Sequence, residues 1–395
     1  MDRPVVFCMD NLESNIWKYY ASGIFQSFWF ILAINILYYQ SFGITYTQLG
    51  LFELISSITI ILFEIPTGAM ADIIGRKLSV FIGVVITAMA MFVIGLSSTA
   101  VFFAAGYFIW AVGMTFVSGA FNALIYDTMK LLGRKSEYLK VQARYNFLTA
   151  LSLIAGLSVA PFLFQINKRL PNIILGFAWL ISSLFILSMA EKKEKHTSYD
   201  IRKHIIQMKS GINYSIKHVR VRWLFLFSIL IGAPLAIFND MMTQPYYLSV
   251  GYSVTQLGLI TAAVYGSASF IASQAYKIEK RLGENASLVL IVFIQAISFF
   301  LMGLFKVPAI LVIVMLLYMS RDFGTMIMDN YVNLHIPSKI RATVLSAGSM
   351  GKDIVMAGAY LLAGYLTDKM SLAPMLILFG IFVAVSAVFL FSIRK

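Results

Sequence analysis

The stretch Gly68-Ala-Met-Ala-Asp72-Ile-Ile-Gly75-Arg76-Lys77 lies between two long apolar runs and is the most informative segment of the chain. Its surroundings recur 208 residues later, where Thr47-Gln-Leu-Gly-Leu51 reappears as Thr255-Gln-Leu-Gly-Leu259. At the same offset Gly75 aligns with Gly283, whereas the aspartate of the first copy is lost. A period of half the chain is too long for a solenoid, so the sequence predicts a duplication in which one copy of the loop has diverged.

The composition is that of a membrane protein. Hydrophobic residues make up 59% of the chain and charged residues 12%, with a mean hydropathy of +0.82. A helix of about 20 apolar residues crosses a hydrocarbon layer of about 30 Å, and continuous apolar runs favour helices over a β-barrel. We therefore predict an all-α membrane protein with twelve spans, near 19–39, 47–70, 79–97, 100–122, 145–164, 172–190, 223–247, 254–275, 286–305, 307–333, 344–366 and 371–392.

The distribution of basic residues predicts the orientation of these spans. If the N-terminus is cytoplasmic, 25 of the 31 lysines and arginines fall on the cytoplasmic side, as the positive-inside rule requires. The formal net charge of +13 is then explained by topology and needs no nucleic-acid partner. We expect both termini to be cytoplasmic, in a monomer embedded in the cell membrane.

The longest polar interruption separates the two halves of the duplication. Within it, isoleucines recur at partly helical spacing among basic residues, which is typical of an amphipathic helix on the inner leaflet. A linker that tethers two bundles explains this segment more simply than a regulatory partner site. We predict an N-terminal six-helix bundle at 1–190, a cytoplasmic amphipathic linker at 191–222 and a C-terminal six-helix bundle at 223–395.

Twelve spans in two halves, with Gly-x-x-x-Asp-x-x-Gly-Arg-Lys between the second and third, resemble the major facilitator superfamily over the whole chain. The family usually has a basic residue after the aspartate, where this chain has Ile73. The runs 63–68 and 123–128 are similar to those of a bacterial branch that contains many drug and metabolite exporters. That branch often has an acidic residue where this chain has Asn122. The resemblance implies a secondary transporter that moves a small molecule by alternating access.

The loop motif can also be explained physically. Gly75 permits a tight turn with positive φ, and Arg76 and Lys77 anchor the loop at the inner surface. Asp72 can contact those cations or the positive end of a helix that begins near Ser338. Family analogy implies that Gly68, Asp72, Gly75, Arg76, Lys77 and Asp127 form a gating motif, with Asp72, Arg76 and Asp127 as a latch. The alternative is a topology signal alone.

Ionisable residues inside the spans are candidates for the transport pathway, because each costs about 2.5–3.5 kcal/mol at a helix centre. Neighbours on a helix do not face each other, so we expect Arg321 to pair with Asp353, or Asp322 with Lys352, across two adjacent spans. Such pairs could be structural or could bind substrate or protons. Asp240 and Glu53 are rival proton carriers. The pathway candidates are Glu53, Asp240, Arg321, Asp322, Lys352 and Asp353.

By family analogy, spans one, four, seven and ten line the central pathway. Their aromatic and amide side chains suit amphiphilic organic solutes, although lipid-facing or interfacial packing is the simpler explanation for any single aromatic residue. The cavity candidates are Gln26, Trp29, Asn35, Trp110, Asn122, Asn239 and Tyr318.

Enzyme chemistry is not indicated, because the sequence has no metalloprotease motif, no cysteine pair and no phosphate loop. We expect no cofactor and no metal. The preferred function is proton-coupled efflux of a small organic solute, with protons and that solute as partners. Proton-coupled uptake of a sugar, amino acid or other metabolite is the alternative, followed by a transporter-like sensor.

Overall fold

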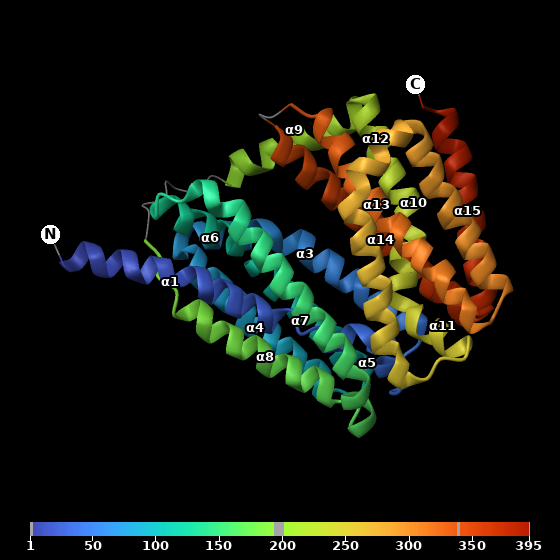
Figure 1. Ribbon diagram of the computed structural model, residues 1–395, viewed down its shortest axis with the longest axis horizontal. Coiled ribbons are helices and arrows are strands. Elements are labelled where there is room, and N and C mark those ends of the chain that lie inside the picture. The colour runs from blue at the N-terminus through green and yellow to red at the C-terminus, as the bar shows by residue number, and fades with distance from the viewer. Residues whose placement is uncertain (1–2, 193–200, 338–339, 395) are drawn as a thin grey trace. The chain divides into compact units, whose positions relative to one another are not determined.

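The computed structural model describes residues 3–192, 201–337 and 340–394. In these ranges the secondary structure is helical, without strands (Figure 1). The chain divides into two compact units, the first comprising Met1–Tyr38 and Ile55–Ile201, the second Tyr39–Leu54 and Arg202–Lys395. The division therefore falls within a helix of the first half, and the later part of the predicted linker groups with the second unit.

The first unit is a bundle of long helices. Within it α4 packs against α5 and α8, and α1 packs against α7 and α8 (Figure 1). Its elements, including the helices that continue into residues 39–54, are α1 (Arg3–Gln26), η1 (Phe30–Ala33), α2 (Asn35–Gln40), α3 (Tyr46–Ile74), α4 (Arg76–Leu96), α5 (Ala100–Val117), α6 (Ala120–Leu131), η2 (Lys135–Glu137), α7 (Tyr138–Ile166) and α8 (Leu170–Leu187).

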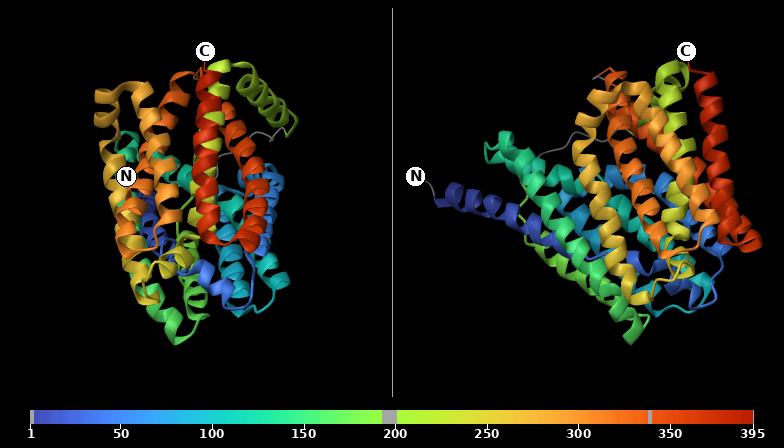
Figure 2. Two further views of the ribbon diagram at one scale, coloured as in Figure 1. Left: turned by 90° about the vertical axis from the view of Figure 1, so that its right-hand side faces the viewer. Right: turned by 45° about the vertical axis from the view of Figure 1, so that its right-hand side comes forward.

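The second unit is also helical. Its helix α12 packs against α13 and α15, while α10 packs against α13, α14 and α15. The amphipathic α9 lies across one end of this unit rather than along its long helices (Figure 2). The elements are α9 (Ile201–Lys217), α10 (Val219–Met241), α11 (Thr243–Ser249), η3 (Val254–Gln256), α12 (Leu257–Leu304), η4 (Pro308–Ile310), α13 (Leu311–Leu334), α14 (Arg341–Met370) and α15 (Leu372–Ser392).

The helices account for the twelve predicted spans. Among the described residues, nine segments are long and apolar enough to cross a membrane. One of them, Val254–Leu304, contains two predicted spans because α12 turns sharply at Gly283. The segment from α1 to α2 and the helix α14 supply the first and eleventh spans.

Three predicted spans are not continuous helices. In the first, α1 ends at Gln26, and a 3₁₀ turn precedes α2, so the expected run 19–39 is broken. In the fourth, α5 ends at Val117 and α6 begins after Gly119, whose φ is +72°. In the seventh, α10 ends at Met241 and α11 begins at Thr243. Hydropathy reports length and apolarity but not backbone continuity, so the sequence could not reveal these breaks.

The repeated Thr-Gln-Leu-Gly segment begins a helix in both halves. Before α3, the Thr45 amide donates to Gln48 Oε1 at 3.0 Å, and the Gln48 amide donates to the Thr45 hydroxyl at 3.2 Å. Ser253 and Gln256 form the same reciprocal capping box before α12. Each box satisfies amide groups that the first turn of a helix leaves unpaired. The repeat therefore preserves a signal for helix initiation.

The repeated glycines make equivalent turns. Gly75 has φ 98° and ψ 151°, and Gly283 has φ 73° and ψ 171°. This region of backbone space is essentially restricted to glycine. The prediction of a positive φ at Gly75 is confirmed, and Gly283 introduces a kink within α12.

The first turns of α3 pack tightly against α14 in the second unit. A Cβ atom on Gly50 would lie 2.5 Å from the Tyr360 carbonyl oxygen, and one on Gly364 would lie 2.2 Å from the Tyr46 carbonyl oxygen. The Asp368 carboxylate accepts hydrogen bonds from the Tyr46 amide at 3.0 Å and the Thr47 amide at 2.8 Å. Small residues thus allow close approach, and a carboxylate from α14 caps the helix.

Candidate functional site

The loop motif forms a compact polar cluster in the first unit. Arg76 donates through Nη1 to the Asp127 carboxylate and to the Ala123 carbonyl oxygen, the latter at 3.1 Å. Asp72 lines the same small cavity, of about 70 Å³, as Arg76 and Asp127. Ser338, near which the sequence predicts the start of a helix that could receive Asp72, lies outside the described residues. The structure gives no steric reason for Gly68, since a Cβ atom there would meet nothing within 4 Å.

A residue that the sequence did not indicate completes this cluster. The Glu191 carboxylate accepts hydrogen bonds from the Arg76 amide at 2.7 Å and from the Lys77 amide at 3.3 Å. It therefore satisfies the first amides of α4 and places negative charge at the end of the helix where the dipole favours it. Lys77 Nζ also donates to the Leu187 carbonyl oxygen at 3.4 Å. The sequence placed Glu191 at the start of the linker, where nothing signalled a cap for a helix that begins 115 residues earlier.

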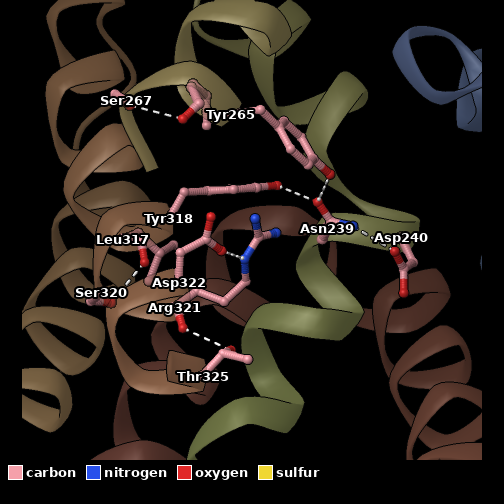
Figure 3. Close-up of polar contacts among 11 residues, drawn as sticks. Asn239, Asp240, Tyr265, Ser267, Leu317, Tyr318, Ser320, Arg321, Asp322 and Thr325 are labelled. Atoms are coloured by element: carbon pink, nitrogen blue, oxygen red, sulfur yellow. Dashed lines mark hydrogen bonds and ion pairs between the residues drawn. The ribbon is translucent and has the colours of Figure 1, made fainter. Parts of the chain in front are cut away.

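Asn239 is the centre of a polar network in the second unit. Its side-chain oxygen accepts hydrogen bonds from the hydroxyls of Tyr265, at 2.8 Å, and Tyr318, at 2.7 Å. Its side-chain nitrogen donates to Asp240 at 2.6 Å. Figure 3 shows the two tyrosines converging on Asn239 from one side, with Asp240 on the other. The amide thus connects α10, α12 and α13.

Asp240 extends the network to α14. Its second carboxylate oxygen accepts a hydrogen bond from the Tyr360 hydroxyl. Glu53, on the part of α3 that belongs to this unit, lies within electrostatic range of Asp240. Both carboxylic side chains are only partly exposed. The two rival proton carriers therefore belong to one cluster.

The expected pairing of Arg321 is wrong. Arg321 donates through Nε to its neighbour Asp322 at 2.7 Å, rather than to Asp353. Adjacent positions point in different directions on a helix, but the long arginine side chain bends back far enough to pair through Nε. The guanidinium carbon also lies 4.6 Å from the Tyr318 ring centroid and 5.1 Å from that of Tyr265. Arg321 is therefore held by one carboxylate and two aromatic faces.

The expected alternative, Asp322 with Lys352, is also not formed. Asp322 pairs with Arg321, while Lys352 makes no hydrogen bond or ion pair with the described residues. Lys352 does lie within electrostatic range of Asp353, Asp329 and Asp240. Helix rotation decides which neighbours a charged side chain meets, and an apolar sequence around it contains little information about that rotation.

Two cavity candidates of the first unit pack within that unit. Gln26 is buried and donates through Nε2 to the Ser182 hydroxyl at 2.8 Å. Trp29 contacts Trp179 edge to face, with ring centroids 6.2 Å apart. Both side chains therefore hold α1 and its continuation against α8, which is the packing role that the sequence left open.

The other three candidates of this unit differ in exposure. Asn122 is exposed and accepts a hydrogen bond from the Tyr19 hydroxyl at 3.3 Å. Asn35 begins α2 and is half-buried. The Trp110 indole nitrogen is buried and has no hydrogen-bond partner among the described residues. Trp110 is thus the candidate here with an unused donor.

Sequence reasoning missed Tyr265, Tyr360 and Thr243, whose hydroxyl lies 3.2 Å from that of Tyr318. A tyrosine in an apolar span is common, and only the direction of its hydroxyl shows that it serves a polar site. Within the part of the chain that the structure describes, histidine, cysteine, aspartate and glutamate form no group that could hold a metal ion.

Comparisons with known proteins agree with this architecture. The model of the Major Facilitator Superfamily matches residues 19–360. The uncharacterized MFS-type transporter YxaM of Bacillus subtilis (strain 168) is 24% identical over 385 residues, which cover 92% of this chain and 90% of that protein.

Two solved structures share the fold. The nucleoside transporter NupG matches with a TM-score of 0.80 and 14% identity, covering 98% of this chain and 99% of that one. A bacterial homolog of the human lysosomal transporter Spinster matches with a TM-score of 0.75 and 13% identity, covering 100% of this chain and 98% of that one. With a family model matched over most of its length and a fold shared with transporters, the chain belongs to the major facilitator superfamily and is a multi-pass membrane transporter of small molecules, not an enzyme.

Proposed function

We propose that the chain exports a small organic solute across the cell membrane in exchange for protons, as a monomer with both termini in the cytoplasm. The observation that carries this proposal is the position of Asp240, which shares hydrogen bonds with Asn239 and Tyr360 and lies within electrostatic range of Glu53. A carboxylic side chain inside a membrane span is costly and is a functional candidate by default.

The network gives protonation a structural consequence. An ionised carboxylate only accepts hydrogen bonds, whereas a protonated one also donates. A proton on Asp240 therefore changes the bonds to Asn239 and Tyr360, which come from its own helix and from α14. Through Asn239 the change reaches the two tyrosines that flank Arg321. Protonation can thus favour one conformation of the second unit over another.

The gating motif complements this site. We propose that Gly68, Asp72, Gly75, Arg76, Lys77 and Asp127 control the exposure of the central pathway, with Glu191 as a further member. The ion pair between Arg76 and Asp127 supports the role of those two residues. A cluster of charges at a moving loop can bias an equilibrium between two states, even where each pair contributes little to stability.

The second candidate is proton-coupled uptake of a metabolite. It is favoured by the likeness in fold to NupG, whose described cargo is a nucleoside. Both candidates use the same carboxylates, so they differ in the direction of the proton relative to the solute.

Proteoliposomes that contain a pH-sensitive dye distinguish the two. A panel of lipophilic cations, antibiotics, sugars, amino acids and small carboxylates is added outside, with no initial pH difference. Exchange predicts that solute entry makes the lumen more alkaline, and symport predicts that it makes the lumen more acidic. Asp240→Asn, Glu53→Gln or both should abolish the signal. Glu137→Gln is the control, since Glu137 pairs with Arg134 in a loop.

A solute that enters without a pH change, or a signal that survives in both carboxylate variants, would contradict proton coupling through this cluster. The absence of any solute flux with correctly inserted protein would contradict transport of these classes and favour the sensor.

A further inference from the structure

A cavity of about 230 Å³ lies beside Arg321, among helices α10, α12, α13 and α14 of the second unit. It is separate from the hydrogen bonds of Asn239, although Arg321 borders both. The residues that line it are Phe227, Ser228, Ile231, Gly232, Ala236, Ile291, Gln295, Arg321, Gly324, Thr325, Met328, Asp329 and Lys352.

The sequence of α10 creates the space. Ser228, Gly232 and Ala236 recur at intervals of four residues, so they share one face of the helix and present small side chains to the cavity. A Cβ atom on Gly232 would meet nothing within 4 Å. On α13, Arg321, Thr325 and Asp329 repeat at the same interval, which places their side chains along the facing wall. Small residues on one helix thus oppose polar residues on another.

The lining has an excess of positive charge. It contains two cations, Arg321 and Lys352, and one carboxylate, Asp329. The Asp322 carboxylate accepts a hydrogen bond from Nε of Arg321, and Asp322 does not line the cavity. Asp353 adjoins Lys352 but is turned about 100° around α14 and is likewise outside the lining. A small anion that enters would therefore meet two positive groups and one negative group.

Helix α12 contributes an unused acceptor to the lining. Gln295 is 3% exposed, and its side-chain oxygen has no hydrogen-bond partner among the described residues. A buried amide oxygen that lacks a donor costs free energy, which a donor from a bound molecule would recover. Ile231, Ile291 and Met328 supply apolar surface to the same cavity. The cavity thus combines positive charge, one acceptor and a hydrophobic wall.

We propose that this cavity binds the substrate as a small organic acid, whose anionic group lies between Arg321 and Lys352. Its hydroxyl or amino group donates to Gln295, and its carbon skeleton packs on the apolar wall. This assignment of substrate class rests on the proposed transport function. Export of a monovalent anion in exchange for one proton moves two positive charges inward, so an inside-negative membrane potential would drive export and oppose entry.

Charged thiol reagents test the site without knowledge of the natural substrate. Cys8 is the one cysteine of the chain, so Cys8→Ser provides a background in which Ser228→Cys is the sole thiol. Full-length protein in nanodiscs is treated with anionic sulfonatoethyl, cationic trimethylammonioethyl or neutral methyl methanethiosulfonate. Each labelling rate is divided by the rate at which the same reagent reacts with β-mercaptoethanol, which corrects for the intrinsic reactivity of the reagent. Thr325→Cys serves as a second reporter, because it lines the same cavity from α13.

The anionic reagent is expected to react about tenfold faster than the cationic one after this correction, since one unit charge a few ångströms away has an effect of about that size. Lys352→Met should reduce the ratio of the anionic to the cationic rate about tenfold, and Asp329→Asn should raise this ratio. Lys369→Met, on the same helix but outside the cavity, is the matched control and should leave the ratio unchanged.

A ratio at or below one at both reporters would overturn the proposal, as would a ratio that Lys352→Met does not change. Failure of the neutral reagent at both positions would show a cavity closed to solutes, with the same consequence. The readout needs no transport. Selective labelling without proton flux would retain the anion site and reject proton coupling, whereas proton flux without selectivity would reject the anion site alone.

Discussion

The side-chain amide of Asn239 pairs with three groups at once: its oxygen accepts hydrogen bonds from two tyrosine hydroxyls, and its nitrogen donates to one carboxylate. Asn239→Ala leaves Tyr265 and Tyr318 without their acceptor and Asp240 without one donor. Because buried polar groups that lose a partner cost about 1–3 kcal/mol each, we expect the apparent affinity for solute to fall at least tenfold. The measurement is the concentration dependence of solute-driven pH change in proteoliposomes.

Tyr265→Phe is the graded comparison for Asn239→Ala, because it removes one hydroxyl and leaves the rest of the network in place. It should weaken apparent affinity by a smaller factor. Equal affinities for the wild type, Asn239→Ala and Tyr265→Phe would show that the network is structural. Insertion of each variant is checked by its yield of monodisperse protein after purification.

At the scale of single residues, the sequence predicts which polar residues belong to the site better than it predicts which residues they contact. The sequence indicates Asp240, Asn239 and Tyr318 because polar groups are rare in apolar spans, and all three lie in one network. The pairing of Arg321 with Asp322 was not foreseen, because reach and rotamer decide it. Tyr360 could not be recognised, since one tyrosine among 20 carries no distinguishing signal.

At the scale of elements, the two turn glycines preserve geometry while the charges around them change sign. Asp72 and Arg76 of the first copy correspond to Lys280 and Glu284 of the second. Glu284 pairs with Arg220 and, at 2.6 Å, with Arg394. The second loop is therefore a charge-inverted counterpart of the first. The sequence comparison correctly matched the turn but interpreted the changed charges as simple loss.

Alanine substitutions at Gly75, Gly283 and Gly68 are expected to change the unfolding temperature by different amounts. Gly75→Ala and Gly283→Ala place a Cβ atom on backbone that only glycine adopts readily, at a cost of about 1–3 kcal/mol. At Gly75 the new atom would also lie 2.7 Å from Glu191 Oε2, whereas at Gly283 it would meet nothing within 4 Å. Gly75→Ala should therefore lower the unfolding temperature more than Gly283→Ala. Thermal unfolding of the purified variants in detergent measures this order.

Gly68→Ala is the control from the same motif. Its Cβ atom would occupy open space within α3, and alanine favours a helix over glycine by about 1 kcal/mol. This variant should unfold at the wild-type temperature or slightly above it. A loss of stability at Gly68 as large as that at Gly75 would contradict the assignment of strain to the turn.

At the scale of the whole molecule, composition and basic-residue bias were enough to predict an all-helical membrane protein of twelve spans. The length of each hydrophobic run is a local property of the chain, so a single sequence is enough to predict the spans. The broken first span, and the grouping of Tyr39–Leu54 with the second unit, depend on tertiary packing and could not be predicted. The same holds for Glu191, which caps a helix far away in the sequence.

The gating motif makes the last prediction, because it concerns the conformational cycle rather than one contact. Asp72→Asn removes a negative charge from the cavity shared by Arg76 and Asp127, and Glu191→Gln weakens the charge that stabilises the start of α4. A change of about 1.4 kcal/mol in a two-state equilibrium alters populations tenfold. We therefore expect either variant to reduce initial transport rates severalfold with normal insertion, measured per molecule with a fluorescent tag.

Glu13→Gln provides the comparison, because Glu13 is an exposed carboxylate that pairs with Arg134 in the same unit but lies outside the motif. Its transport rate should equal that of the wild type, since exposed ion pairs contribute little. Normal turnover in Asp72→Asn would reduce the motif to a topology signal. Normal turnover in Glu191→Gln alone would keep Asp72, Arg76 and Asp127 as the gate and restrict Glu191 to capping a helix. A loss in both variants would make the start of the linker part of the gate, so that the segment joining the two halves would respond to the same movement that opens the pathway.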